Sequence, residues 1–236
     1  MRRTGRKRPK RSRLRSIAKW FIIPLAVVFV LTNFQVVALR FFNPPCTSFM
    51  IWQNMHRDKR MIRPRYLAYW CELRDISPHL RKAVLAGEDQ RFLFHHGFDV
   101  IELEGAIREL TQKKGKRGAS TITMQVARTV YLWPGRSWAR KMIEAYYTVL
   151  IEFYWSKERI LEVYLNTVDW GTGIIGAEAA ARKYFHVSCK NISKAQAAAL
   201  AAILPSPHRW SPVRPNRHVQ RRKLRILRDM DKMPLL

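Results

Sequence analysis

The sequence predicts an all-α, mainly helical protein in which one transmembrane helix precedes a folded domain. Three observations support this prediction. Apolar residues recur at helical spacing over most of the chain, Ser and Pro residues stand where helices would begin, and strand-like alternation is nearly absent.

The chain begins with a basic tail followed by an apolar stretch. The first nineteen of the 236 residues contain ten Lys and Arg and no acidic residue. Residues 20–39 carry no charge, and this length of helix is enough to cross a bilayer core. Because Lys and Arg stay on the cytoplasmic side, we expect residues 1–19 to form a cytoplasmic tail and residues 20–39 an uncleaved transmembrane helix. A cleaved signal peptide is the alternative, but the apolar stretch is long and no small-residue cleavage pattern follows it.

The remaining chain is expected to comprise a linker and membrane-proximal segment, residues 40–74, and one domain, residues 75–236. About 195 residues are enough to bury a hydrophobic core. Without the ten charges of the tail, the net charge falls from +27 to +17. This excess favours an anionic partner, and acidic lipids or a diphosphate-bearing substrate suit an anchored protein better than nucleic acid. A merely basic, solvated surface is the alternative.

Capping residues and apolar periodicity predict the helices of this domain. The expected helices begin at Ser77-Pro78, Ser137, Ser156, Ser193 and Val219. The first helix ends near Glu88, the fourth is rich in Ala and stops before Pro205, and the last ends near Met230. Residues 112–118, which are basic and spaced by glycines, are expected to form a mobile loop.

Two further patterns carry weaker information. Residues 171–176 fit a dinucleotide-binding glycine pattern, but a helix precedes them where a strand is needed, so we interpret them as a closely packed tight turn. Cys46, Cys71 and Cys189 have no metal-type spacing. A disulfide between Cys46 and Cys71 and three packed thiols both remain open.

Two acidic residues lie within dense polar signatures. Glu88 opens the segment Glu88–Gly97, and Glu144 ends the segment Arg140–Glu144. Two placed carboxylates beside a cluster of cations suggest sugar chemistry on a phosphorylated donor. The alternatives are ordinary ion pairs: one at a helix end for Glu88 and one within a helix for Glu144. The adjacent pair His95-His96 is not expected to bind metal, because neighbouring side chains diverge and no third ligand stands nearby in the sequence.

Five segments occur in a characteristic order, and they are Glu88–Gly97, Gly118–Gln125, Arg140–Glu144, Lys157–Asn166 and Gly176–Phe185. Together they resemble the motif set of the peptidoglycan glycosyltransferases, over roughly residues 75 to 215. Because no transpeptidase domain follows, the chain resembles the monofunctional biosynthetic transglycosylases of this family more than the bifunctional penicillin-binding proteins.

The resemblance implies a lysozyme-like head lobe and a smaller, membrane-proximal jaw lobe. It implies polymerisation of lipid II into β-1,4 glycan with inversion and release of polyprenyl diphosphate, at the bacterial inner (cytoplasmic) membrane with the catalytic domain outside the cytoplasm. The implied partners are lipid II, the nascent glycan strand and membrane lipids, with other cell-wall synthesis proteins as candidates and no nucleic acid. No cofactor is required, and a divalent cation such as Mg or Mn at Glu144 is an optional aid.

The resemblance also assigns roles to individual residues. Glu88 aligns with the general base, and Glu144 assists at the diphosphate. The expected substrate-binding residues are Arg128, Arg136, Arg140, Lys141, Ser120, Thr121 and Gln125. For Ser120 and Thr121, capping of a helix is the alternative to contact with an anion. The chain departs from the family where Met124 replaces a common Gln and Arg128-Thr129 replaces a common Lys-Asn pair.

Two other functional classes remain open at this point. A lysozyme-like hydrolase would share the catalytic Glu, but it does not need a cluster of Arg and Lys around a diphosphate. A membrane-tethered module that binds nucleic acid or anionic lipid would explain the charge, but not the placement of Glu88 and Glu144.

Overall fold

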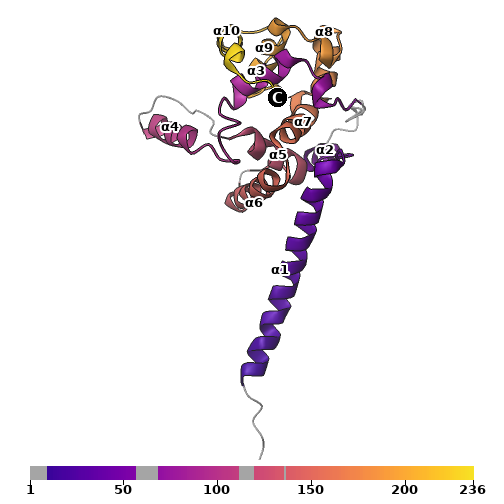
Figure 1. Cartoon of the computed structure of the whole chain (residues 1–236), viewed down its shortest axis with the longest axis vertical. Coiled ribbons are helices and arrows are strands. Elements are labelled where there is room, and N and C mark those ends of the chain that lie inside the picture. Colours follow the sequence, from indigo (N-terminus) through magenta and orange to yellow (C-terminus); the bar gives the residue numbers. More distant parts are fainter. Residues whose placement is uncertain (1–9, 57–68, 112–119, 136) are drawn as a thin grey trace, which may run out of the picture. The chain divides into compact units, whose positions relative to one another are not determined.

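The computed structural model describes residues 10–56, 69–111, 120–135 and 137–236 (Figure 1). The structure is 67% helical, which confirms the all-α prediction. By internal contacts the chain divides into two compact units, residues 1–42 and residues 43–236.

The first unit contains one long helix, α1 (Lys10–Phe41). Its segment Ile22–Phe41 is long and apolar enough to cross a membrane, and little of that segment is buried. Because this apolar segment is not packed into a protein core, it fits a single-pass membrane anchor close to the predicted residues 20–39.

The second unit is built from short helices and one small hairpin. In chain order its elements are α2 (Ser48–Met55), η1 (Leu73–Asp75), α3 (Pro78–Glu88), α4 (Val100–Thr111), α5 (Ile122–Tyr131), α6 (Trp138–Tyr154), α7 (Lys157–Thr167), β1 (Asp169–Gly171), β2 (Ile174–Ile175), α8 (Ala177–Phe185), η2 (Cys189–Asn191), α9 (Lys194–Ile203), α10 (Arg217–Asp229) and η3 (Met230–Lys232).

Local capping sets most of the helix starts that the sequence predicts. The hydroxyl groups of Ser137 and Ser156 accept hydrogen bonds from backbone N–H groups three residues later, and Ser193 forms a full capping box. The last helix begins at Arg217 instead of the expected Val219, because the Asn216 side chain caps it. The predicted starts are therefore confirmed to within two residues.

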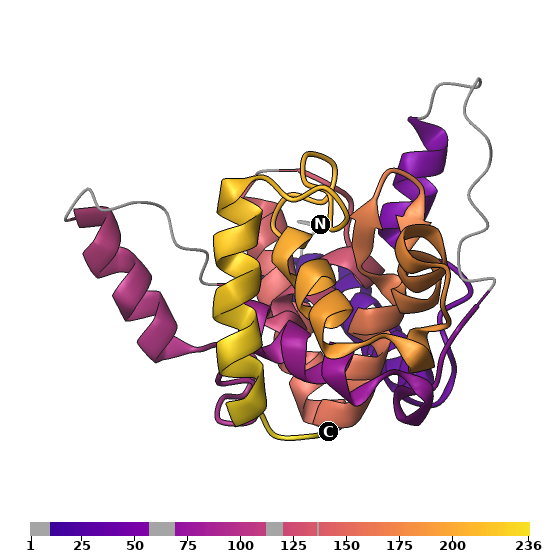
Figure 2. The ribbon, with the colours of Figure 1, turned by 90° about the horizontal axis from the view of Figure 1, so that it is seen from above.

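Three helices pack tightly against one another and carry the end of α3 into the interior. Helix α9 contacts both α3 and α10, and α10 also contacts α3 (Figure 2). Residues 197–203 of α9, mostly Ala, are all buried. Such small side chains let neighbouring helix backbones approach closely. A methyl group on Gly87 of α3 would lie only 3.1 Å from Ile226 of α10, so this contact is already close-packed.

A second group of helices forms around α5, which packs on α6, α7 and α2. The rings of Tyr131 on α5 and Tyr147 on α6 stack with centroids 4.3 Å apart. Tyr164 of α7, Phe92 and Trp170 are among the largest fully buried side chains. Phe92 and Tyr164 belong to the polar segments Glu88–Gly97 and Lys157–Asn166, so the hydrophobic core helps to anchor both segments.

The glycine-rich segment after α7 forms a small antiparallel hairpin. Asp169 pairs with Ile175, and Gly171 pairs with Ile174. Gly176 has a φ of +84°, and a Cβ there would lie 2.8 Å from the backbone oxygen of Asn166. Only glycine fits this position. The predicted turn with close packing is thus confirmed, and the two short strands are an addition to the expected elements.

Helix α4 stands apart from its neighbours in both views of the second unit (Figures 1 and 2). Its apolar residues Val100, Ile101 and Leu103 are exposed. The predicted loop 112–118 that follows lies outside the described residues. Residues 43–236 form one compact unit, so the division into head and jaw lobes stays a prediction of the resemblance.

Candidate active site

Glu88 lies at the last position of α3, where its carboxylate is shielded and held by two donors. Gln125 donates its amide N–H to Oε2 over 3.0 Å, and Arg222 donates to Oε1 over 2.8 Å. The Glu88 side chain is only 12% exposed. A carboxylate in this position is anchored but still accessible.

Burial governs the protonation of Glu88. It raises the pKa of the Glu88 carboxyl above its ordinary value. The positive charge of Arg222 and the hydrogen bond from Gln125 lower the pKa, but they do not cancel the effect of burial. A carboxylate whose basicity is increased in this way is suited to accept a proton from a sugar hydroxyl.

Gln125 connects Glu88 to Tyr164 of α7. The Tyr164 hydroxyl donates to the amide oxygen of Gln125 over 3.3 Å, so the amide N–H₂ group faces Glu88. Burial and the nearby Glu88 raise the pKa of Tyr164, whereas the charges of Arg128 and Arg222 lower it. Arg222 and Arg128 thus both act on this hydroxyl, and of the two only Arg222 forms a hydrogen bond to Glu88 among the described contacts.

Arg222 and Tyr164 are site residues that the sequence analysis missed. Tyr164 lies in the segment Lys157–Asn166 of the motif set and Arg222 lies in the last predicted helix, but the sequence pattern assigns a role in the site to neither residue. Arg222 also donates to the backbone oxygen of Gly87 over 2.7 Å, so it holds both the end of α3 and the carboxylate of Glu88.

Asp89 fixes the loop that follows Glu88. Its buried carboxylate contacts the His95 ring at 2.9 Å and accepts the backbone N–H of Ile122, at the start of α5, over 2.9 Å. The Thr121 hydroxyl donates to the Gly97 oxygen over 2.6 Å. These bonds join the first polar signature to the start of α5, and they position Glu88 opposite Gln125.

The structure places two carboxylates near His95, although the sequence indicated no third ligand there. Asp89, His95 and Asp99 are buried and offer ligand atoms within 4.8 Å of one another. Asp89 is already bonded to His95, and Arg91 lies 3.2 Å from Asp99. We interpret the group as an internal ion network, because a cation already accompanies it.

Glu144 lies on α6 at the centre of a second cluster. Its buried side chain, 2% exposed, accepts from Arg140 over 2.8 Å and from Lys141 over 2.5 Å. Lys141 is 40% exposed and Arg140 only 9%. The intrahelical ion pairs considered in the sequence analysis are therefore present. One negative charge among two positive charges leaves the cluster cationic, with Lys141 at its open side.

This geometry does not favour a divalent cation at Glu144. Each carboxylate oxygen already accepts a hydrogen bond from a cationic side chain, and a metal ion would be repelled by both.

The other predicted binding residues differ in their surroundings. Arg128 on α5 is exposed, and Ser120 is partly exposed just before this helix. Thr121 is buried, and its hydroxyl both caps α5 and donates to Gly97. Arg136 lies outside the described residues. Contact of any of these residues with a substrate stays a prediction.

The predicted site residues therefore form two groups. Glu88 and Gln125 are joined to Tyr164 and Arg222 by hydrogen bonds, with Arg128 on the same helix as Gln125, whereas Arg140, Lys141 and Glu144 lie together on α6. Within the described ranges, no hydrogen bond or ion pair joins Glu88 to Glu144. Helix α5 connects the groups, because Gln125 contacts Glu88 and α5 packs on α6.

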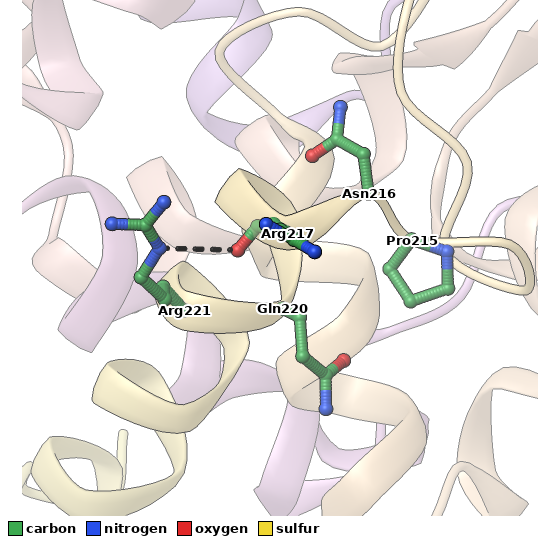
Figure 3. A pocket seen from close by; sticks show the side chains of 5 residues that line it. All are labelled: Pro215, Asn216, Arg217, Gln220 and Arg221. Carbon is green, nitrogen blue, oxygen red and sulfur yellow. Dashed lines mark hydrogen bonds between the residues drawn. The ribbon is translucent and has the colours of Figure 1, made fainter.

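A surface pocket of about 540 Å³ lies elsewhere, at the start of α10 (Figure 3). It is lined by Pro215, Asn216, Arg217, Gln220 and Arg221. Arg221 donates to the backbone oxygen of Arg217 over 3.4 Å. Neither candidate catalytic carboxylate lines this pocket, so we do not assign the chemistry to it.

The helical domain shields the carboxylate of Glu88, whose pKa is raised, and it gathers cations around Glu144. This arrangement is expected of an enzyme that transfers sugars from a phosphorylated donor. Comparison with known proteins agrees with this class. A family model described as "Transglycosylase" matches residues 59–231. The chain belongs to this family, and it is a peptidoglycan glycosyltransferase enzyme, as its motifs predict.

Curated relatives match most of the chain. A protein named "Biosynthetic peptidoglycan transglycosylase" from Ectopseudomonas mendocina (strain ymp) is 43% identical over 228 residues, which cover 93% of this chain and 91% of the relative. Proteins of the same name from Bacteroides thetaiotaomicron (43% identical, 89% of this chain and 85% of the relative) and Pseudomonas entomophila (46% identical, 84% of both) are similar.

Proposed function

We propose that this enzyme polymerises lipid II into β-1,4 glycan strands of peptidoglycan. The 4-hydroxyl of the acceptor sugar attacks the anomeric carbon of the lipid-linked donor strand. The bond from that carbon to the diphosphate breaks, polyprenyl diphosphate leaves, and the configuration inverts. The observation that carries the proposal is the shielded carboxylate of Glu88, which is joined through Gln125 to a helix packed on a cationic cluster.

In this proposal Glu88 is the general base. Its carboxylate takes the proton of the attacking hydroxyl, and its raised pKa increases its affinity for that proton. Gln125 and Arg222 prevent the carboxylate from rotating away, because each oxygen is held by one donor. Tyr164 serves as a positioning residue through Gln125.

The diphosphate is held by the cations of α5 and α6. Lys141 and Arg128 reach solvent and supply charge to the departing oxygens. Arg140 is more deeply placed and adds its positive charge to the cluster from beneath Lys141. Glu144 orients Arg140 and Lys141. We propose that no cofactor is required and that a divalent cation is dispensable.

We further propose a single-pass topology with the tail in the cytoplasm and residues 43–236 outside it. The ten basic residues before the apolar segment favour this orientation. Exposed apolar residues suit contact of the domain with the bilayer, and they include Val100, Ile101 and Leu103 on α4 and Met142, Val149 and Phe153 on α6. Lipid II and the nascent strand are the substrates, and other cell-wall synthesis proteins are candidate partners.

Incubation of the purified enzyme with lipid II and separately with purified sacculi tests the reaction. The proposal expects long glycan and free polyprenyl diphosphate from lipid II in the presence of a chelator, and intact sacculi. Solubilised sacculi without polymerisation would instead assign the protein to the lysozyme-like hydrolases, in which a protonated Glu88 would donate to a glycosidic oxygen.

Two substitutions separate the proposed roles. Glu88→Gln keeps the shape of the side chain but removes the base, so turnover should fall by roughly 10²- to 10⁴-fold while lipid II binding changes little. Near-wild-type turnover of Glu88→Gln would place the base elsewhere.

Lys141→Ala should weaken both lipid II binding and turnover, since a charge-assisted hydrogen bond contributes roughly 1.5 to 3 kcal/mol.

A further inference from the structure

Two of the three cysteines meet in the folded domain. Cys71 lies before η1 and Cys189 begins η2, 118 residues later, yet their sulfur atoms are only 2.8 Å apart. Cys46 is exposed and takes no part in this pair. The pairing of Cys46 with Cys71 considered in the sequence analysis is therefore not the one that the fold brings together.

Rigid contacts hold the backbone at both cysteines. Asn166 accepts the N–H of Cys71 over 2.9 Å and donates to its C=O over 2.8 Å. Glu178 accepts the N–H of Cys189 over 2.7 Å, and the C=O of Cys189 accepts the N–H of Ser77 over 3.0 Å. Because both main chains are held on both sides, the backbone positions that bring the two sulfur atoms together are part of the fold.

We infer that Cys71 and Cys189 are joined by a disulfide bond in the exported enzyme and that Cys46 remains a free thiol. The inference rests on the proposed topology, since disulfides form and persist outside the cytoplasm. Only a small shift separates the two sulfur atoms from the covalent distance of about 2.0 Å.

A zinc site is the alternative for this cluster, because Glu178 offers a carboxylate oxygen within 4.8 Å of both sulfur atoms. Two thiolates that share a tetrahedral zinc, each about 2.3 Å from the metal, lie about 3.8 Å apart. The observed separation of 2.8 Å is much shorter. Structural zinc also needs a fourth ligand, and the group found among the described residues has three.

The oxidant is a protein disulfide or a low-molecular-weight disulfide of the compartment. Cys71 is partly exposed, so its thiolate attacks the oxidant first, forms a mixed disulfide and releases one thiol. The sulfur of Cys189 then attacks Cys71 and releases the second thiol. Two electrons pass from the cysteines to the oxidant, and the two cysteine protons end on the released thiols. The hydrogen bond to Cys71, burial and the neighbouring Glu178 raise the pKa of Cys189, so Cys189 is a poor first nucleophile, and its attack relies on the short distance to Cys71.

A disulfide between Cys71 and Cys189 would restrain the segment that leads into α3, the helix that carries Glu88. The N–H of Ser77, the residue before α3, is bonded to Cys189 itself. A covalent link between Cys71 and Cys189 would tie the segment before α3 to η2. Cross-linking residues so far apart in the sequence restricts the unfolded chain strongly, so the oxidised enzyme should be the more stable form.

The first experiment tests the geometry on the full-length enzyme in detergent. Reduced protein is treated with glutathione disulfide, blocked with a maleimide, digested and analysed by mass spectrometry. The expected result is a linked peptide pair containing Cys71 and Cys189, one blocked thiol at Cys46, and a fall in Tm of roughly 5 °C or more when reductant is added. Cys46→Ser should behave in the same way, whereas Cys71→Ser and Cys189→Ser should lose both the link and the response to reductant.

Other outcomes in this experiment would overturn the inference. They are mixed glutathione adducts alone, a link to Cys46, or stoichiometric zinc that the reduced wild-type protein retains and Cys71→Ser releases. The second experiment blocks thiols in intact cells during an acid quench. A linked pair there supports the inference in full. If the pair is linked in vitro but both thiols are free in cells, the disulfide is not a native feature, and the result also counts against the exported topology. The reaction itself is tested separately by polymerisation of lipid II.

Discussion

The carboxylate of Glu88 is governed by groups from distant parts of the chain. Burial raises its pKa, and Arg222 of α10 provides the largest opposing effect. A general base must be ionised to accept a proton, so the rate should increase with pH through the pKa of Glu88. The acid limb of the pH profile therefore reports directly on the partners of this residue.

Removing the charge of Arg222 should shift this limb. In Arg222→Gln the nearest cation is lost, the pKa of Glu88 rises further, and the half-maximal value of kcat/KM moves to higher pH. Arg221→Gln is the matched control, because Arg221 is a neighbouring exposed arginine that bonds the backbone of its own helix. Profiles measured with lipid II from about pH 4 to 9 check this, and equal profiles for the two variants would contradict it.

The ionised carboxylate of Glu88, which the reaction requires, should lower the stability of the folded protein. A carboxyl whose pKa is raised in the folded state contributes stability while it is protonated, below its unfolded pKa of about 4.3, and that contribution is lost as pH rises through the folded pKa. Glu88→Gln should therefore have a Tm equal to or above that of the wild type near pH 7, and this advantage should vanish near pH 4. Thermal unfolding at both pH values, with the exposed Glu72→Gln as control, tests the sign.

At the scale of elements, the predictable features are those set by neighbours in sequence. Ser137, Ser156 and Ser193 predicted helix starts because each cap bonds a backbone group three residues away. Glu88 and Glu144 were identified because their motifs surround them. Arg222 and Tyr164 were not, since their partners depend on how α10 packs on α3 and how α7 packs on α5. The pairing of Cys71 with Cys189 is invisible in the sequence for the same reason.

Two glycines should respond in opposite ways to the same substitution. Gly176→Ala should lower the free energy of unfolding by more than about 2 kcal/mol, because the residue has a positive φ and the added methyl group would meet the Asn166 backbone. Gly105→Ala should raise it by about 0.5 to 1 kcal/mol, because a Cβ there meets nothing within 4 Å inside α4. Denaturant unfolding of both variants measures the difference, and a similar change in both would contradict it.

At the scale of the whole molecule, most of the net positive charge lies outside the segment that contains the apolar helix. The first 42 residues contain eleven basic and no acidic residues, so residues 43–236 retain a net charge of +16 out of +27. These residues form a compact unit of their own. We propose that the charge on the domain attracts it to anionic lipids.

A protein lacking residues 1–42 should remain folded and should bind vesicles that contain anionic lipid. Its thermal unfolding should match that of the same domain in the full-length enzyme, and binding should weaken with added salt, because surface charges are screened over about 10 Å at 0.1 M. Vesicles of neutral lipid provide the control. Sedimentation with the vesicles measures binding, and salt-independent binding would show that apolar residues such as those of α4 dominate.

The link between Glu88 and Arg222 also orders events during synthesis. The two residues are 134 positions apart, and the second lies on the last long helix. In the proposed orientation, the segment that bears the base leaves the membrane well before α10 does. Until α10 has been translated and has docked against α3, Glu88 lacks the guanidinium that holds one of its oxygens and lowers its pKa, so we expect the carboxylate to reach its final pH dependence only when the last long helix is in place.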